Sequence, residues 1–138
     1  MKLGMSGSRN GITEAANEAL TQFLNNHHIL EAHHGDCVGA DASFHERVEE
    51  KNIKIVIHPP NVTTMRAYCK PSTDGEIRKE IPYLTRNKNI VDSTDMLIAF
   101  PETKEEQWKS GTWSTIRYAK KTNKSIVIIY PDGITEYI

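Results

Sequence analysis

The chain contains few cysteines and no apolar run long enough to cross a bilayer. Its two cysteines, Cys37 and Cys69, need not pair, and so small a number argues against a disulfide-rich secreted scaffold and for a reducing, intracellular setting. The longest apolar runs, residues 96–100 and 126–130, are far shorter than the ~20 residues of a membrane-spanning helix. Residues 1–12 contain no signal-peptide segment. We therefore expect a cytoplasmic protein without a membrane partner.

The chain also lacks an excess of charge of either sign. Its 17 Lys and Arg residues are balanced by 18 Asp and Glu residues, so no global field attracts a nucleic-acid backbone. Basic residues are frequent between positions 66 and 88, but Asp74, Glu76 and Glu80 interrupt them, a pattern that is typical of a solvated face. Long nucleic acid is therefore not expected as the main partner.

Internal repeats and low-complexity tracts are absent as well. With 138 residues the chain has the size of one domain, and we expect residues 1–138 to share a single core. Apolar runs of strand length alternate with stretches of helical periodicity. The five predicted strands are Lys2–Met5, Ile29–His33, Ile53–Ile57, Met96–Phe100 and Ile126–Tyr130. The predicted helices begin after Thr13, near Ala40, near Leu84 and at Thr112.

This alternation predicts an α/β fold. Parallel strands joined by helices need right-handed crossovers, which gives a Rossmann-like, three-layer, doubly wound parallel sheet of about five strands. The expected strand order is 3-2-1-4-5. In that order the first and fourth strands are neighbours whose connections leave in opposite directions, so a crevice opens at their C-terminal ends.

Residues 61–83 interrupt the alternation. They run without strong periodicity through Pro71, Gly75 and Pro82. A structureless connection in a compact domain is seldom longer than about 12 to 15 residues. We expect either a lid-like functional loop or a short helix near residues 65–69.

Three glycine-containing segments follow predicted strands, at 6–11, 35–41 and 110–112. In a parallel sheet all three lie at one edge, where glycine lets the backbone approach an anion and the start of the next helix favours phosphate. Turns commonly contain Gly and Ser, so each segment alone is weak evidence. Together they predict a phosphate-binding crevice.

Two charged residues in these segments have two interpretations each. Arg9 can grip a phosphate in a bidentate manner or pair with Glu14. Asp41 can cap or complement the following helix, or accept hydroxyl groups of a ribose. Trp108 and Trp113 flank Gly111; one could stack on a base, while Trp113 fits the helix's apolar face better.

A metal site or a resident cofactor is not expected. His33, His34, Cys37 and His45 resemble ligands, but neighbouring strand residues point to opposite faces and the spacing matches no closed zinc pattern.

The same loops carry a family resemblance. The segments Gly4–Arg9, Gly35–Asp41, Arg86–Val91, Asp95–Phe100 and Gly111-Thr112 stand in the expected order along nearly the whole chain. The chain resembles the SLOG superfamily, a Rossmann-like group that includes the LOG phosphoribohydrolases, and within it the small proteins of the YpsA type. The resemblance implies that Gly111 and Thr112 face the phosphate of a nucleoside monophosphate or a related ligand. It also implies a homo-oligomer, most simply a dimer.

The candidate ligand-binding residues combine the glycine segments with this resemblance. They are Gly7, Ser8, Arg9, Gly35, Gly39, Asp41, Arg86, Asn87, Gly111, Thr112 and Thr115. Arg117, one turn beyond Trp113, is a further candidate with an ordinary surface role as its alternative.

The chain departs from the family pattern at one position. The LOG enzymes carry a Gly-Thr-x-x-Glu pattern, but this chain has Thr115 where the glutamate is expected. A neutral hydroxyl cannot stabilise an oxocarbenium-like transition state as a carboxylate does. The primary prediction is therefore a module that binds or senses a nucleotide or ADP-ribose-type ligand. The alternatives are an N-glycosidic hydrolase or transferase that uses Glu102, Glu105 or Glu106, and a protein-interaction module with an empty crevice.

Overall fold

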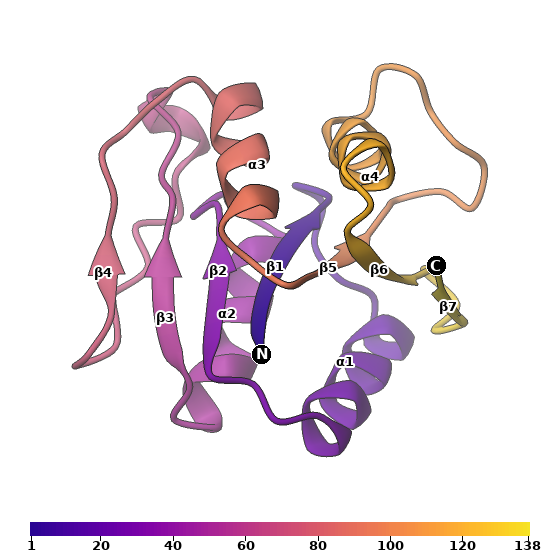
Figure 1. Ribbon diagram of the computed structural model, residues 1–138, viewed down its shortest axis with the longest axis horizontal. Helices are drawn as coiled ribbons and strands as arrows, with labels where there is room; N and C mark the ends of the chain where they lie inside the picture. Colours follow the sequence, from indigo (N-terminus) through magenta and orange to yellow (C-terminus); the bar gives the residue numbers. More distant parts are fainter.

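A computed structural model describes residues 1–138 as four helices packed around one sheet of seven strands (Figure 1). The strand order is β4-β3-β2-β1-β5-β6-β7. The strands are β1 (Lys2–Gly7), β2 (Glu31–His34), β3 (Lys54–Ile57), β4 (Glu76–Ile77), β5 (Met96–Phe100), β6 (Ser125–Ile129) and β7 (Thr135–Tyr137). The helices are α1 (Glu14–Asn26), α2 (Ala40–Glu50), α3 (Tyr83–Asp92) and α4 (Gly111–Lys121).

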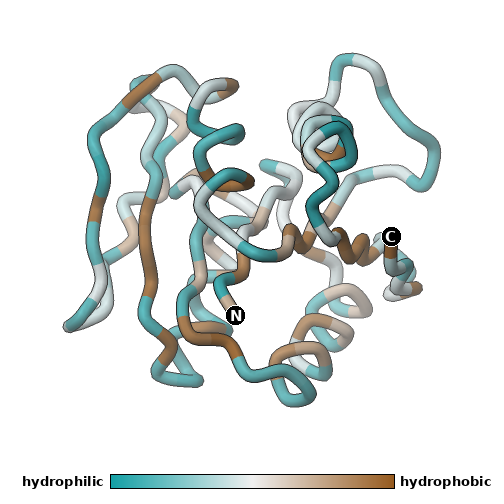
Figure 2. The backbone as a smooth tube through the Cα atoms, viewed as in Figure 1, coloured by the Kyte–Doolittle hydropathy of each residue, from teal (hydrophilic) through white to brown (hydrophobic).

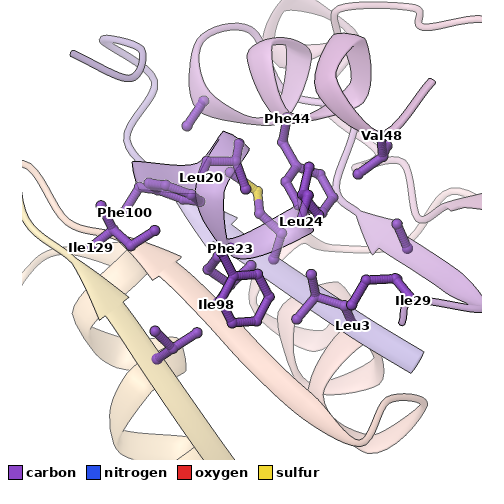
Figure 3. Packing of buried hydrophobic residues seen from close by; sticks show 14 of the residues in the cluster. Leu3, Leu20, Phe23, Leu24, Ile29, Phe44, Val48, Ile98, Phe100 and Ile129 are labelled. Atoms are coloured by element: carbon purple, nitrogen blue, oxygen red, sulfur yellow. The ribbon is translucent and has the colours of Figure 1, made fainter. Parts of the chain in front are cut away.

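Alternating side chains of the strands enter two different cores. On one face α1 and α2 cover Leu3, Ile98 and Phe100 (Figure 3), and Met5 belongs to the same core. On the other face α3 and α4 cover the strand residues that alternate with these, such as Leu97. Because successive strand residues point to opposite faces, a strand buried on both sides is apolar throughout. Figure 2 accordingly shows hydrophobic segments in β3, β5 and β6 and a hydrophilic loop between β5 and α4.

The predicted α/β class and the mostly parallel sheet are confirmed. The predicted number of about five strands was wrong, and the predicted order 3-2-1-4-5 therefore does not describe the whole sheet. The five expected strands lie side by side as β3-β2-β1-β5-β6, and short strands extend the sheet at both edges. β4 consists of two exposed residues and shows no hydrophobic periodicity. β7 is antiparallel to β6 and follows the turn at Asp132-Gly133.

The segment between β3 and α3 contains no α-helix at 65–69, and its expected role as a lid-like functional loop stays a prediction. It contains a 3₁₀ turn at Thr63–Met65 and then β4. Asp36 fixes its middle part: one carboxylate oxygen accepts from Arg66 Nε at 2.9 Å and the other accepts from the backbone N–H of Cys69 at 2.8 Å. Since Asp36 is fully buried, these bonds hold the segment against the loop after β2.

No helix of the structure has both the length and the apolar character needed to span a membrane.

The start of α1 provides a test of the local architecture. Thr13 Oγ1 accepts from the N–H of Ala16 at 3.1 Å and donates to the carbonyl of Pro131 at 2.6 Å, which ties α1 to the end of β6. Thr13→Ala removes both bonds, and we expect it to lower the free energy of unfolding in urea by about 1 to 2 kcal/mol. Thr21→Ala, within the same helix, is the control and should change that free energy by less than about 0.5 kcal/mol. Equal losses in the two variants would contradict the capping role.

Candidate functional site

A cavity of about 540 Å³ lies at the C-terminal edge of the sheet. β1 and β5 pair in parallel from Leu3 and Met96 to Gly7 and Phe100, and the helices that follow them, α1 and α4, cover opposite faces. In Figure 1 the arrowhead of β1 lies between α3 and α4. The cavity is lined by Met5, Ser6, Gly7, Ser8, Arg9, Asn10, Gly35, Cys37, Asp41, Met65, Tyr83, Arg86, Asn87, Ile90, Glu102, Lys109, Ser110, Gly111 and Thr112.

The loop after β1 packs tightly on the start of α2. Ser8 accepts from the N–H of Ala40 at 2.9 Å and donates its own N–H to Phe100 at 3.2 Å. A Cβ on Gly7 would come within 2.5 Å of the Ala40 side chain, and a Cβ on Gly39 within 2.3 Å of the Arg9 backbone. These glycines are thus required by the close approach of two backbones.

The start of α4 presents backbone donors to the cavity. Ser110 Oγ caps the helix by accepting from the N–H of Trp113 at 3.2 Å. The N–H groups of Gly111 and Thr112 donate to nothing within the chain, and the space beside Gly111 is open. Two free donors at the positive end of a helix form a potential anion-binding surface.

Two cations at the cavity have no partner in the chain. Neither Arg9 nor Lys109 takes part in an ion pair or a side-chain hydrogen bond. The alternative pairing of Arg9 with Glu14 is therefore not observed. The two unpaired cations stand at the same cavity as the unbonded N–H groups of α4. This part of the cavity therefore attracts negative charge.

Arg86 is a cation of a different kind, since only 4% of it is exposed. Its guanidinium bonds the carbonyl oxygens of Gly35 and His58, the latter at 3.0 Å, and it reaches Cys37 Sγ at 3.5 Å and Asn87 Oδ1 at 2.8 Å. Gly35 makes room for it, because a Cβ there would stand 2.3 Å from Arg86 Nη1. Arg86 thereby joins α3 to the ends of β2 and β3.

Asp41 has an unusual environment in the first turn of α2. Its carboxylate does not cap that helix; it accepts from the backbone N–H of Cys37 at 3.0 Å in the loop before it. Burial raises the pKa of Asp41 from 3.8 to about 6, although the charge of Arg86 and the N–H bonds from Cys37 and Gly35 oppose the rise. The cavity thus holds a carboxylate that exchanges its proton close to neutral pH.

Gly39 and Thr115 are the two candidate residues that do not line the cavity. The Thr115 hydroxyl donates to the carbonyl of Gly111 at 2.8 Å, and the side chain is buried within the helix packing. Arg117 also lies elsewhere, because it pairs with Glu106 at 2.7 Å and stacks over the exposed ring of Trp108. Trp113 is buried in the core, as its place on the apolar face of the helix predicted.

Four of the six histidines form two hydrogen-bonded chains. Asp36 N–H donates to Nδ1 of His34 at 3.0 Å, so Nε2 carries the proton of the neutral ring and donates to Nδ1 of His45 at 2.9 Å. Burial holds the pKa of His34 well below 6.5. On the other face of the sheet His33 bridges Glu31 and His58.

One group of side chains has the composition of a metal site. Ligand atoms of His34, His45 and Cys69 lie within 4.8 Å of one another. A metal ion on Nε2 of His34 would require the ring proton on Nδ1, where the Asp36 N–H already donates. The hydrogen bonds therefore fit a structural cluster better than a metal centre.

Several lining residues were not among the candidates. Lys109 and Ser110 directly precede Gly111, so their position next to a phosphate-type turn was a usable signal. Met65 and Tyr83 stand towards the two ends of the irregular segment, and contacts between distant segments bring them to the cavity, such as the bond from the N–H of Val38 to the carbonyl of Met65 at 3.0 Å.

The fold and the cavity define a Rossmann-like α/β protein. Its ligand-sized opening lies at the topological switch point of the sheet, where the connections after β1 and β5 leave to opposite faces. No protein-family model and no curated protein matches the chain. Solved structures do. A molybdenum cofactor binding protein from the phototrophic bacterium Rippkaea orientalis aligns with a TM-score of 0.69 and 19% identity, over 94% of this chain and 76% of that one.

Two further structures resemble the chain. TM1055, a structural-genomics target, aligns with a TM-score of 0.64 and 14% identity over 91% of this chain and 71% of its own. DNA processing protein A from Streptococcus pneumoniae aligns with a TM-score of 0.66 and 19% identity, over 92% of this chain but only 49% of that longer chain. The three alignments show a shared fold, as the resemblance noted in the sequence implies.

The raised pKa of Asp41 predicts a pH dependence of stability. The folded protein retains the Asp41 proton up to about pH 6, whereas the unfolded chain loses it near 3.8. The stabilisation from this proton is present below about pH 4 and is lost as the pH rises through 6. Since each pKa unit is worth about 1.4 kcal/mol, the parent should lose roughly 3 kcal/mol relative to Asp41→Asn between about pH 4 and 7.

Urea unfolding of both proteins at several pH values measures this difference. Asp74→Asn is the control, because its exposed side chain forms no ion pair, and its curve should stay parallel to that of the parent. A parallel curve for Asp41→Asn would show that Asp41 titrates normally.

Proposed function

We propose that the protein binds a nucleotide-type, phosphate-bearing small molecule in the cavity between the ends of β1 and β5. The observation that carries the proposal is the set of unsatisfied donors on one cavity: the guanidinium of Arg9, the ammonium of Lys109 and the free N–H groups of Gly111 and Thr112. A phosphate group satisfies backbone donors and cations together.

The size and lining of the cavity support a small molecule. A volume of about 540 Å³ falls in the usual range of ligand sites, roughly 300 to 1,000 Å³. On the side opposite α4, Asp41 offers a carboxylate oxygen to the cavity, and it is mainly ionised at neutral pH because its pKa is about 6. A hydroxylated sugar between these two sides would have acceptors near Asp41 and donors near its phosphate.

The fold neighbours add limited support. The Rippkaea orientalis protein is described as binding the molybdenum cofactor, so a related fold holds a small ligand. DNA processing protein A is named for acting on DNA, but the balanced charge of this chain does not favour a long polyanion. The expected homodimer stays a prediction; Tyr68, Tyr83 and Trp108 are exposed and available to an interface.

Cleavage of an N-glycosidic bond is the second candidate, because Glu102 lines the cavity. We do not favour it, since Thr115 replaces the glutamate of the family pattern and its hydroxyl is bonded to Gly111. Incubation of the protein with nucleoside monophosphates, followed by chromatography, should reveal no sustained release of free base. Release that disappears in Glu102→Gln would establish the hydrolase instead.

The binding proposal predicts unequal effects of two substitutions. Arg9→Ala removes a charged partner of the phosphate and should weaken binding of a nucleoside monophosphate about ten- to a hundredfold, because a hydrogen bond to a charged group is worth about 1.5 to 3 kcal/mol. Thr115→Ala, outside the cavity, should change the affinity by no more than about threefold. Calorimetric titration measures both.

Arg47→Ala is the matched arginine control, because Arg47 lies in the last turn of α2 and pairs with Glu50 at 3.0 Å. Its affinity should equal that of the parent. An unchanged affinity in Arg9→Ala would remove Arg9 from the site. Parent protein that binds no nucleotide, in calorimetry or as a shift of its melting temperature, would favour an interaction module instead.

A further inference from the structure

A second, smaller opening of about 220 Å³ lies beside the main cavity, on the α1 side of the loop after β1. Four elements meet there: this loop, the start of α1, and the segments that follow β5 and β6. It is lined by Ser8, Asn10, Gly11, Ile12, Thr13, Ala16, Phe100, Pro101, Glu102, Ile129 and Pro131.

The two openings share part of one wall. Ser8, Asn10 and Glu102 line both of them. Asn10 Nδ2 donates to the Glu102 carboxylate, and Ser8 Oγ accepts from the N–H of Asn10 at 3.0 Å. The two volumes are therefore adjacent, and an elongated molecule that crosses this shared wall would reach both.

The chemistry of the second opening differs from that of the first. Its only charged side chain is Glu102, and the Thr13 hydroxyl is used twice, by Ala16 N–H and by the Pro131 carbonyl. Besides the shared Ser8 and Asn10 and the small residues Gly11 and Ala16, the walls are the side chains of Ile12, Phe100 and Ile129 and two prolines. Such a volume repels phosphate and accepts a flat ring; an apolar cavity of roughly 150 Å³ is already enough for benzene.

We propose that this opening, the ring pocket, takes the heterocyclic base of the ligand whose phosphate occupies the main cavity. This inference rests on the proposed function. Burial of the ring faces against Ile12 and Ile129 supplies affinity, since apolar area is removed from water. The Glu102 carboxylate and the Asn10 amide stand at the boundary, where they meet the amino and carbonyl groups on the edge of a base.

The first test compares ligands that differ only in the ring. Calorimetry on the full chain uses AMP and UMP, which carry a base, and ribose 5-phosphate, which does not. At least one nucleotide should bind about tenfold more tightly than the sugar phosphate, because only it fills the ring pocket. Equal affinities for all three compounds would overturn the ring pocket and leave the phosphate site standing. Absence of binding by all three would overturn the proposed function itself.

The second test fills the ring pocket. Ile12→Trp should weaken binding of the preferred nucleotide about tenfold and leave ribose 5-phosphate within about twofold of its parental affinity. Leu30→Trp is the control: Leu30 is 58% exposed at the other end of the sheet, beside Met1, and its substitution should change neither affinity. Equal loss for both ligands, or loss for neither, in Ile12→Trp would count against the ring pocket.

A measurement on the parent protein covers the case in which Ile12→Trp does not fold. Carbon-13 methyl spectra should show the Ile12 and Ile129 signals moving when the preferred nucleotide is added and staying in place with ribose 5-phosphate. Unmoved methyl signals in the presence of bound nucleotide would place the base elsewhere.

Discussion

The buried guanidinium of Arg86 is the contact on which the candidate site depends most. A cation removed from water is tolerated only where acceptors surround it. Here they are the carbonyl oxygens of Gly35 and His58 at the ends of β2 and β3, together with Cys37 Sγ and the amide of Asn87. The missing side chain at Gly35 leaves the space that the guanidinium fills. Arg86 therefore fixes the position of α3 relative to the ends of β2 and β3, and with it one wall of the cavity.

The positive groups at the cavity divide into structural and available ones. Arg86 is enclosed by acceptors, and its charge lowers the cost of ionising Asp41 nearby. Arg9 and Lys109 stand in loops with no partner in the chain. A ligand cannot compete for Arg86 without exposing two buried carbonyl groups, whereas binding to Arg9 or Lys109 breaks nothing. In the proposed function, the affinity for an anion therefore comes from the loops, and α3 fixes the geometry of the site.

The sequence was informative where burial determines the pattern. β5 was predicted to the residue, because Met96–Phe100 is apolar on both faces and ends at a proline. β4 was missed, since two exposed residues carry no periodicity and are held only by pairing with β3. The glycine segments indicated which loops meet at the cavity, but not that Gly39 serves loop packing, nor that Met65 reaches the site, where its carbonyl accepts from the N–H of Val38. Contacts between distant segments have no signature in a local pattern.

The local bonding of Thr115 bears on whether the site only binds its ligand or also cleaves it. Its hydroxyl donates to the Gly111 carbonyl one turn earlier, a bond that a residue with a short side chain makes inside its own helix. The position is therefore satisfied within the helix and offers no charge to the cavity. Meanwhile the N–H groups of Gly111 and Thr112 stay free. Donors that bind a phosphate equally well in the ground state and in the transition state contribute affinity and leave kcat unchanged. Free donors at the start of α4 and a neutral residue at position 115 therefore agree with the proposed binding function.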